Sequence, residues 1–392
     1  MRLVEVNTTS LANQFILVNV LMNKGDNAYI RPIDKEVNDI FDITKNKNYQ
    51  HGKTCRWVLY SDTNELIGRI AAFTNKKYIC KGTDFKVGCF GYFDCIDNQQ
   101  AANMLLDKAQ EWLKEEGMEA MDGPINFGDR DKNWGLMVEG FGKEPIYGMA
   151  YNPSYYQKLL ENNELKNYYF QYYFSIDNLD NIAGKHVERC QRFKSKPDYT
   201  AKHIKIKDLE KHAEDFATVY NAAWAQHEEG KDITTEQIKK AFKAMKPVME
   251  ERSIWFAYYK EEPIAMFISL QDVNQYFKHF NGKLGLWQKL KLLWMRKNGK
   301  CRKLIGIAFG VVPKFQSLGI DSFIIHECAT LVKATNCYDE FELGWSGDWN
   351  PKMMSVYKSL GAKQSRTLIT YRKIFDNKYP FQRHPEMEYK KH

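Results

Sequence analysis

The sequence LIGIAFGVVPKFQSLGIDSFIIHEC, at residues 304–328, decides how the rest of the chain is interpreted. Residues 304–312 form an apolar and partly β-branched run that predicts a buried strand, which Pro313 ends. Apolar residues then recur with the spacing of a helix face, at Phe323, Ile324, Ile325 and Ala329. In the loop between them, Gly319 lets backbone N–H groups face one point, and the helix N-terminus adds about +0.5 of an elementary charge there. The junction therefore suits an anionic group such as a diphosphate.

A second strand and helix are predicted in the segment 340–362. Residues 340–345 alternate in polarity like a strand. Pro351 fits the first position of a helix capped by Asn350, and Gly361 fits the end of that helix.

Together these segments resemble the GNAT-type N-acyltransferases, which use acyl-CoA. The binding loop of that family usually reads Gln/Arg-x-x-Gly-x-Gly/Ala, and 316–321 reads Gln-x-x-Gly-x-Asp. The later family pattern Asn-x6-Tyr-x3-Gly is matched by Asn350, Tyr357 and Gly361. The resemblance implies that acetyl-CoA or another acyl-CoA binds as a co-substrate. The residues implied to bind it are Val311, Val312, Gln316, Ser317, Leu318, Gly319, Ile320, Asp321 and Asn350.

Three residues carry the expected chemistry or depart from the pattern. Asp321 replaces a small residue, and its carboxylate would repel a diphosphate unless it turned inward to cap the helix. The resemblance implies that Tyr357 is the general acid, because a phenol is protonated at neutral pH and can protonate a departing thiolate. The alternative is that Tyr357 packs in the core while Asn350 only caps its helix. Glu342 is the candidate general base, with a water chain as an equal alternative.

Composition indicates a globular protein of two domains. The chain has 392 residues, of which 44% are hydrophobic and 14% aromatic. A net charge of +8 suits an anionic cofactor but falls short of a nucleic-acid footprint. The eight cysteines form no Cys-x-x-Cys pair and are expected to be reduced thiols. Without a signal-peptide pattern or an 18-residue apolar stretch, a cytoplasmic location is expected.

The predicted fold is α/β (α+β), with two tandem GNAT-like domains, each a mixed and mostly antiparallel twisted sheet flanked by helices. Residues 1–177 repeat the strand and helix order as a degenerate copy, because the loop 97–101 lacks a glycine. This copy is expected not to hold CoA. Residues 178–392 form the acyl-CoA-binding domain and end in an expected hairpin at 366–375, while the aromatic strand 168–176 is expected to cross into the second half.

Loops of the first half allow two interpretations. The segments 122–130 and 151–156 combine turn formers with aromatic and amide side chains. They either build a ligand pocket or only form turns between neighbouring elements. In the second half, His227, Glu228 and Glu229 either contact an amine or form a solvated charge cluster.

A basic insertion at 276–303 interrupts the second half. It has no acidic residue and carries Lys or Arg at positions 278, 283, 289, 291, 296, 297, 300, 302 and 303. Within it, Trp287, Leu290, Leu293 and Trp294 can share one helical face. The helix either makes peripheral contact with a membrane or a lipid-like substrate, or packs its apolar side on its own domain and leaves the lysines in solvent.

The sequence therefore predicts an N-acyltransferase that moves an acetyl or longer acyl group from acyl-CoA to a primary amine. The acceptor is a small molecule or lipid-like, attack is direct in a ternary complex, and N–H groups near Val311 or Val312 polarise the carbonyl. Two alternatives stay open: a non-catalytic module that binds CoA or another ligand, and a lipid or aminoacyl transferase of the tandem-GNAT type. Neither a metal nor a nucleic-acid partner is expected, and the oligomeric state is left open.

Overall fold

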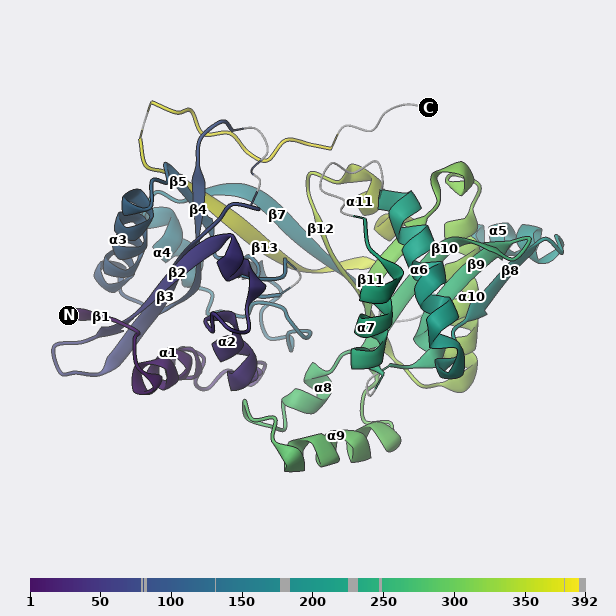
Figure 1. Cartoon of the computed structure of the whole chain (residues 1–392), viewed down its shortest axis with the longest axis horizontal. Helices are drawn as coiled ribbons and strands as arrows, with labels where there is room; N and C mark the ends of the chain where they lie inside the picture. Colours follow the sequence, from purple (N-terminus) through teal and green to yellow (C-terminus); the bar gives the residue numbers. More distant parts are fainter. Residues whose placement is uncertain are drawn as a thin grey trace.

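A single sheet of thirteen strands runs through the computed structural model, with helices on both faces (Figure 1). The structure describes residues 1–78, 80, 83–130, 132–176, 184–224, 232–246, 249–376 and 378–387. The strand order is β1-β2-β3-β4-β5-β13-β7-β12-β11-β10-β9-β8, and β6 pairs with β13. The predicted α/β class with a mostly antiparallel sheet is confirmed.

The first unit has five strands from the first third of the chain. They are β1 (Arg2–Glu5), β2 (Gly52–Tyr60), β3 (Leu66–Asn75), β4 (Val87–Cys95) and β5 (Ala120–Gly123). Its helices are α1 (Thr9–Met22), α2 (Asp34–Ile40), α3 (Gln99–Glu115) and α4 (Tyr156–Asn162), with a 3-10 turn at Lys47–Gln50. Because successive strand residues point to opposite faces, Val58 packs against α1 while Trp57 and Leu59 pack against α3.

The second unit repeats this order. Its strands are β8 (Tyr199–His203), β9 (Ile254–Tyr259), β10 (Glu262–Gln271), β11 (Lys303–Val311) and β12 (Glu340–Gly347). Its helices are α5 (Gly184–Lys194), α6 (Leu209–Trp224), α7 (Thr235–Met245), α10 (Ile320–Thr335) and α11 (Pro351–Ser359). Short 3-10 turns lie at Ile206–Asp208, Glu251–Ser253 and Pro313–Phe315. In both units the fourth and fifth strands pair in parallel, at β4–β5 and β11–β12.

The two units exchange their last strands. β7 (Lys166–Ile176) comes from the first half and pairs with β12, as the prediction for 168–176 required. β13 (Lys363–Ile374) ends the second half but lies between β5 and β7, where it also pairs with β6 (Leu136–Glu139). The hairpin expected at 366–375 is therefore wrong, because these residues form one continuous strand. The predicted boundary between residues 177 and 178 lies outside the described residues, and β7, the last described strand before it, pairs with both β12 and β13 in the undivided sheet.

A buried ion pair ties the exchanged strand to the first unit. On β13, Arg372 donates from Nε and Nη2 to the two carboxylate oxygens of Asp122 on β5, both at 2.7 Å. Both side chains are fully buried. The two parallel hydrogen bonds of such a pair fix how β13 lies against β5. Removal of either partner would leave an uncompensated charge in the core.

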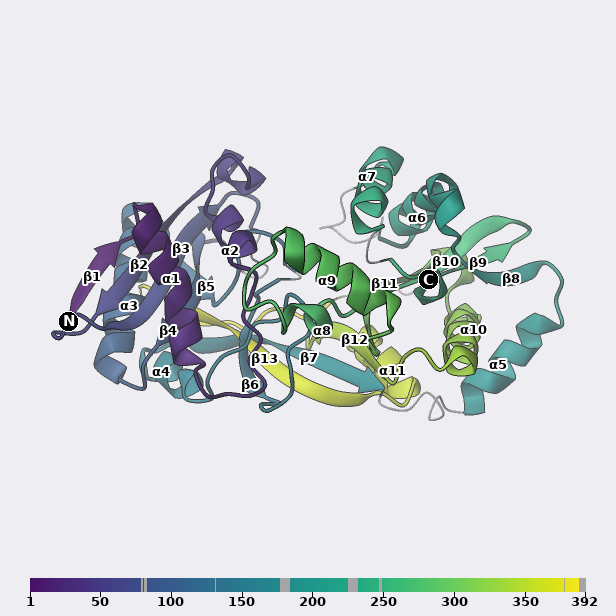
Figure 2. The same ribbon diagram turned by 90° about the horizontal axis from the view of Figure 1, so that it is seen from below.

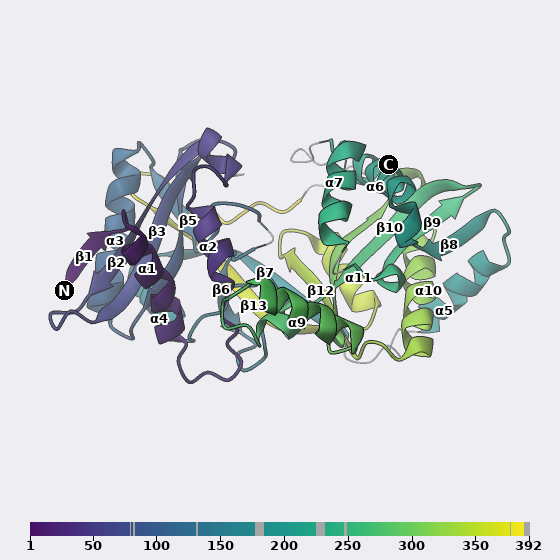
Figure 3. The same cartoon turned by 60° about the horizontal axis from the view of Figure 1, so that its bottom comes forward.

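The insertion forms two helices beside the junction of the units, α8 (Asn274–Phe277) and α9 (Leu286–Lys297). Figures 2 and 3 show α9 lying across the outside of the molecule between the two units. Leu292 and Met295 of α9 pack in a cluster with Tyr276 and Phe277 of α8 and with Ile33 of the first unit. Among the helices that the structure describes, none is long and apolar enough to cross a membrane.

Candidate functional site

The loop between β11 and α10 brings the predicted diphosphate-binding residues together. The Gln316 side chain turns back and donates to the Val311 carbonyl at 3.1 Å. Ser317 and Gly319 have positive φ angles of 63° and 95°, and Gly319 occupies the N-cap of α10. A left-handed backbone at the N-cap favours glycine. Glycine has no side chain, so it offers no oxygen to the N–H groups of the first turn. The N-terminus of α10 is therefore built to present backbone N–H groups to an outside acceptor.

Charged residues of both signs lie beside this loop. A Cβ atom added to Gly319 would sit 3.3 Å from Cδ of Arg189, which comes from α5. The side chain of Arg189 therefore packs against the loop at Gly319. Asp321 lies in the first turn of α10, and the N-cap of that helix has no side-chain hydrogen bond. Among the described residues Asp321 makes no hydrogen bond that caps α10, so the condition under which its carboxylate would not repel a diphosphate is not met.

Beyond their first residues, β11 and β12 diverge. They pair only at Lys303 with Glu340, Leu304 with Phe341, and Ile305 with Glu342. β11 nevertheless continues to Val311 with β10 as its partner. Its edge facing β12 thus has no ladder partner in the described sheet from Gly306 onward. An extended ligand chain could lie in this opening and use the free strand edges.

The amide of Val312 is already used within the sheet. Its N–H donates to the Ile264 carbonyl at 2.9 Å, and Val311 pairs with Ala265. The expectation that the Val312 N–H polarises a substrate carbonyl is therefore not supported by the geometry.

Tyr357 reaches the point where the strands diverge. Its ring is buried against Phe174, with ring centroids 5.0 Å apart, and its hydroxyl donates to the Leu343 carbonyl on β12 at 3.1 Å. Burial raises the pKa of Tyr357 above its ordinary value. At the other end of the helix, the Asn350 side chain accepts from the Met353 N–H at 3.1 Å, as an N-cap does. The predicted cap is confirmed, and the general-acid role of Tyr357 stays a prediction.

Glu342 occupies a different environment from the one expected of a general base. Its Oε1 accepts from Nη1 of Arg366 at 2.7 Å and also from the Ser365 hydroxyl, and all three side chains are buried. Arg366 in turn donates to the Glu144 carbonyl at 2.7 Å. The carboxylate thus joins β12 to β13 and to the first unit, a geometry that favours a structural role.

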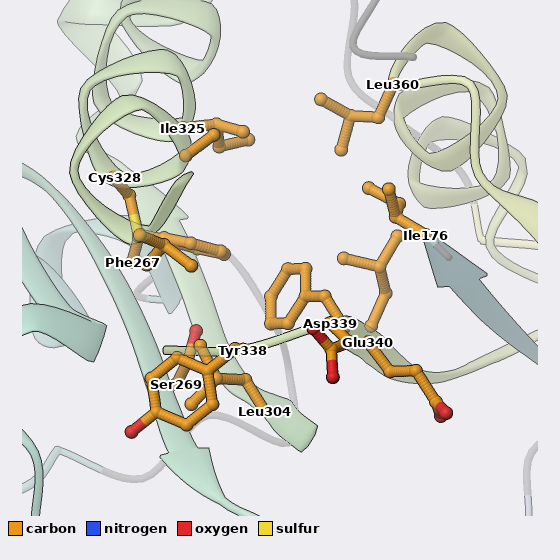
Figure 4. Close-up of a pocket in the computed structure, with 14 residues that line it drawn as sticks. Ile176, Phe267, Ser269, Leu304, Ile325, Cys328, Tyr338, Asp339, Glu340 and Leu360 are labelled. Atoms are coloured by element: carbon orange, nitrogen blue, oxygen red, sulfur yellow. The ribbon is translucent and has the colours of Figure 1, made fainter. Parts of the chain in front are cut away.

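An apolar slot of about 30 Å³ lies between α10, α11 and the sheet (Figure 4). Leu343, whose carbonyl holds the Tyr357 hydroxyl, lines it together with Leu304. Figure 4 shows Ile325 and Cys328 on the helical side of the slot, with Leu360 across from them. A space of this size accommodates about one water-sized or methylene-sized group. The slot therefore offers a small apolar pocket next to the residue that anchors Tyr357.

A larger cavity of about 170 Å³ lies on the first-unit side of the molecule. Its polar end includes Arg69, whose Nε lies 2.6 Å from the Asp94 carboxylate, and Tyr92, whose hydroxyl donates to Asn126 at 2.9 Å. The apolar wall includes Ile16, Ile30, Ile33, Val37, Ile40 and Phe277. Asn126, Asp129 and Tyr151 also line it, so both turn-rich segments contribute to a pocket. Sequence reasoning missed Arg69 and Asp94, although each interrupts an apolar strand, which is the signal that could have found them.

One hydrophobic cluster packs between this cavity and the strands β11 and β12, where they diverge. Tyr147 and Met149 line the cavity, and both pack in a cluster with Ile305 of β11 and Trp345 of β12. Leu304, the neighbour of Ile305, points into the core that contains Tyr357. Because strand neighbours face opposite sides, the cavity and Tyr357 lie on opposite faces of the sheet at this point.

The matching helix of the first unit is capped differently. The Asn98 side chain accepts from the Ala101 N–H at 2.9 Å, so a side-chain oxygen already occupies one of the N–H groups at the N-terminus of α3. This contrast with Gly319 supports the prediction that the first unit does not hold CoA in the usual manner.

Two further groups of residues carry side chains that bind ligands or metals in other proteins. His227, Glu228 and Glu229 lie outside the described residues. Cys190, His326 and Glu327 lie within 4.8 Å of one another, but Nζ of Lys194 is 2.7 Å from Glu327, and burial raises the pKa of Cys190 to about 11. A neutral thiol and a lysine-paired carboxylate make a poor set of metal ligands. All eight cysteines are free, as expected.

The arrangement described above is the tandem fold of the GNAT-type N-acyltransferases. A tandem GNAT protein from the clavulanic acid biosynthesis pathway superposes with a TM-score of 0.53 and 8% identity, over 96% of this chain and 98% of that protein. A GCN5-related N-acetyltransferase from Sphaerobacter thermophilus superposes with a TM-score of 0.50 and 10% identity, over 99% and 98% of the two chains. At these identities the likeness shows the fold alone.

Two curated proteins are similar in sequence along nearly their whole length. The chain is 22% identical to the bacterial ceramide synthase of Caulobacter vibrioides over 375 residues, which cover 94% of this chain and 96% of that one. It is 24% identical to Protein YghO of Escherichia coli over 377 residues, which cover 92% of each chain. No protein-family model matches the chain.

Proposed function

We propose that this protein is an acyltransferase that moves an acyl group from acyl-CoA to the primary amine of a long-chain, lipid-like acceptor. The observation that carries the proposal is the opening between β11 and β12 beside the glycine-led N-terminus of α10. The similarity to a protein named ceramide synthase supports the acceptor class, because a ceramide is an N-acylated long-chain amine. Acetyl transfer to a small amine is the less favoured form of the same reaction.

The residues present fit an acyl-CoA molecule. The backbone around Gly319 and the side chain of Arg189 would hold the diphosphate, although the carboxylate of Asp321 opposes this binding. The unpaired edge of β11 would pair with the amide groups of the pantetheine arm. Acyl-CoA would supply the activated thioester on which the transfer depends.

The chemistry requires one bond to form and one to break. The amine nitrogen attacks the thioester carbonyl, the new C–N bond forms, the C–S bond breaks, and the nitrogen loses a proton. Tyr357 would give its hydroxyl proton to the departing thiolate, and burial keeps that proton in place at neutral pH. Since Glu342 is paired with Arg366, a water chain is the better candidate to accept the proton from the amine.

The cavity of about 170 Å³ would hold the acceptor. Its apolar wall suits an aliphatic chain, and its polar end at Arg69, Tyr92 and Asn126 suits hydroxyl groups. Because a hydrophobic cluster packs between the cavity and the strands at Ile305 and Trp345, the acceptor route would lie on the face opposite Tyr357. The amine and the leaving thiolate would thus be served from opposite sides of the thioester.

The first test separates binding from turnover. Gly319→Val forces a β-branched residue into a left-handed backbone and brings its Cβ against Arg189, so we expect CoA affinity to fall at least tenfold in calorimetry. The matched control, Asn98→Val, changes the corresponding N-cap of the first unit and should leave CoA affinity unchanged.

Turnover is then measured as thiol release from acetyl-CoA and long-chain acyl-CoA with amines of increasing chain length. The proposal expects release that rises with the chain length of the amine. Binding of CoA without release from any amine would contradict it and favour a non-catalytic module. Equal loss of CoA affinity in Gly319→Val and Asn98→Val would overturn the placement of the site.

A further inference from the structure

The helix α9 of the insertion has two apolar faces, and only one of them is used by the fold. Leu292 and Met295 point inward and pack against α8 and Ile33. The large apolar residues on the other side are exposed in the described structure: Leu286 by 70%, Trp287 by 79%, Leu290 by 49%, Leu293 by 50% and Trp294 by 58%. Of the two alternatives for this helix, packing of the apolar side on its own domain therefore does not hold for these tryptophans. At 100° per residue the exposed residues span an arc of about 120°, roughly opposite the buried pair.

Basic residues border this outward face. Lys289 and Lys291 lie at its two edges in the helical projection, and Lys297 lies at its C-terminal end. Three of the insertion's other basic residues are engaged elsewhere: Lys278 with Glu144, Arg302 with Asp339, and Lys303 with Glu340. Within the described part of the chain, no carboxylate forms an ion pair with Lys283, Lys289, Lys291, Lys297 or Lys300.

We propose that α9 docks the protein onto the surface of an anionic lipid bilayer. Tryptophan and leucine side chains on a helix lying parallel to a membrane enter the boundary between headgroups and acyl chains, and lysines at the edges contact anionic headgroups. A second protein copy would meet five unpaired lysines with five more of the same sign. The charge pattern therefore selects an anionic surface over self-association.

The inward side of α9 packs directly against residues that line the acceptor cavity. Ile33 and Phe277 line the cavity, and both pack in the same cluster as Leu292 and Met295. The loop before α9 contacts the start of α2, where the Asp34 N–H donates to the Gly282 carbonyl at 2.8 Å, and residues of α2 also line the cavity. This part of the inference rests on the proposed function: a lipid-like amine would pass from the bilayer into a cavity directly behind the docked helix.

The test is co-sedimentation of the full chain with vesicles of phosphatidylcholine alone or with 30% phosphatidylglycerol. We expect binding to the anionic vesicles that weakens in 0.5 M NaCl, since each lysine near such a surface contributes about fivefold in affinity. Trp287→Ser/Trp294→Ser should lower the partition coefficient at least tenfold, and Lys289→Gln/Lys291→Gln should lower it at least tenfold as well. The control Ile43→Ser removes a similarly exposed apolar residue, 73% accessible, that lies outside α9, and this variant should bind as the parent does.

Folding and function are followed separately. All of the substituted residues are exposed, so melting temperatures and CoA affinity in vesicle-free solution should stay at the parental values. Parental vesicle binding by the tryptophan variant would overturn the proposal. So would a parent that fails to bind anionic vesicles but forms a dimer in light scattering that Trp287→Ser/Trp294→Ser dissociates, because the face would then join two copies. Failure of the proposed acyl transfer would instead appear as absent thiol release with intact vesicle binding.

Discussion

Tyr357 is the residue on which the chemistry of transfer would depend most directly. Its hydroxyl is held at the Leu343 carbonyl, where β11 and β12 diverge, and burial keeps it protonated. Tyr357→Phe preserves the ring packing against Phe174 and removes only the proton donor. We expect turnover to fall by about 10²–10⁴-fold with little change in CoA affinity, as measured by thiol release and calorimetry. Stability should fall by about 1 kcal/mol, because the Leu343 carbonyl loses its donor.

The pH profile provides an independent check on Tyr357. Because burial raises its pKa above the ordinary value, the parent should show no loss of turnover from deprotonation of this tyrosine up to about pH 10. A Phe variant with normal turnover would remove Tyr357 from the mechanism and leave water to protonate the thiolate. A large loss of stability without a specific loss of turnover would show that the hydroxyl is only a structural hydrogen bond.

At the level of elements, Asp272 ties the insertion to the rest of the fold. It lies just after β10, where its Oδ1 accepts from the N–H of Tyr147 at 2.9 Å and from that of Asn274 at 3.1 Å. Within the described structure its Oδ2 is buried without a hydrogen-bond partner. Burial raises the pKa of Asp272 to about 6, against lowering by the two N–H groups and by Lys303. A carboxylate at this position is thus a cost to folding at neutral pH.

This cost predicts a stability change with a defined sign. In the unfolded chain the group titrates near pH 4, so between about pH 4 and pH 6 the folded state holds more protons. The stability from the protonated form is complete below pH 4 and is lost as the pH rises through 6. Asp272→Asn keeps an oxygen acceptor without the charge. It should raise the free energy of unfolding by about 3 kcal/mol at pH 7.5, and by little at pH 4.

Urea unfolding at both pH values measures the difference between parent and Asp272→Asn, which cancels the other titrating groups. A variant that is less stable than the parent at pH 7.5, where the parent carboxylate is charged, would contradict the prediction and show that the bonds from Tyr147 and Asn274 depend on the full charge.

Local sequence signals predict which residues form a helix or strand more reliably than they predict which elements pack together in space. The strand, loop and helix around Gly319 and the cap at Asn350 follow from residues within one turn of each other, and the structure has them as predicted. The partner of a strand is not a local property, so the alternation in 363–374 could not show that β13 lies beside β5. Arg189 was missed for the same reason, since it reaches the loop from a helix about 130 residues earlier in the chain.

The insertion shows a second limit of pattern analysis. Its apolar residues were assigned to one face by spacing, and the spacing was right for Trp287 and Trp294. Spacing alone did not reveal that Leu292 and Met295, on the opposite side, supply the contact with the core. Where a helix has apolar residues all round, the neighbours in space decide which side is buried.

At the scale of the whole molecule, the exchanged strands make each unit depend on the other. β13 completes the sheet of the first unit beside β5, and β7 completes that of the second beside β12. Glu342 on β12 and Arg366 on β13 form a buried ion pair, and Arg366 extends it across the junction to the partly buried Glu144 carbonyl of the first unit. Since the central pair β7–β13 takes one strand from each half, the junction is part of the core and not a linker between finished domains.

This topology predicts that the chain cannot be divided at residue 177. A fragment 1–177 would expose the edge of β5 and leave β7 without β12 or β13, and a fragment 178–392 would expose the edge of β12 and leave Arg372 without Asp122. An unpaired edge and an uncompensated buried charge of this kind cost about 3–5 kcal/mol for the charge alone. We expect each fragment expressed alone to aggregate or to lack a cooperative unfolding transition.

The matched control is co-expression of the two fragments, which restores every strand pair and breaks only the connection after β7. We expect a soluble heterodimer that unfolds cooperatively and binds CoA with the affinity of the intact chain. A monomeric 178–392 fragment that unfolded cooperatively near the parental midpoint would show that the second unit does not need β7. In that case the exchange of strands would join two independently stable domains, and the acyl-CoA site could be studied without the first half of the chain.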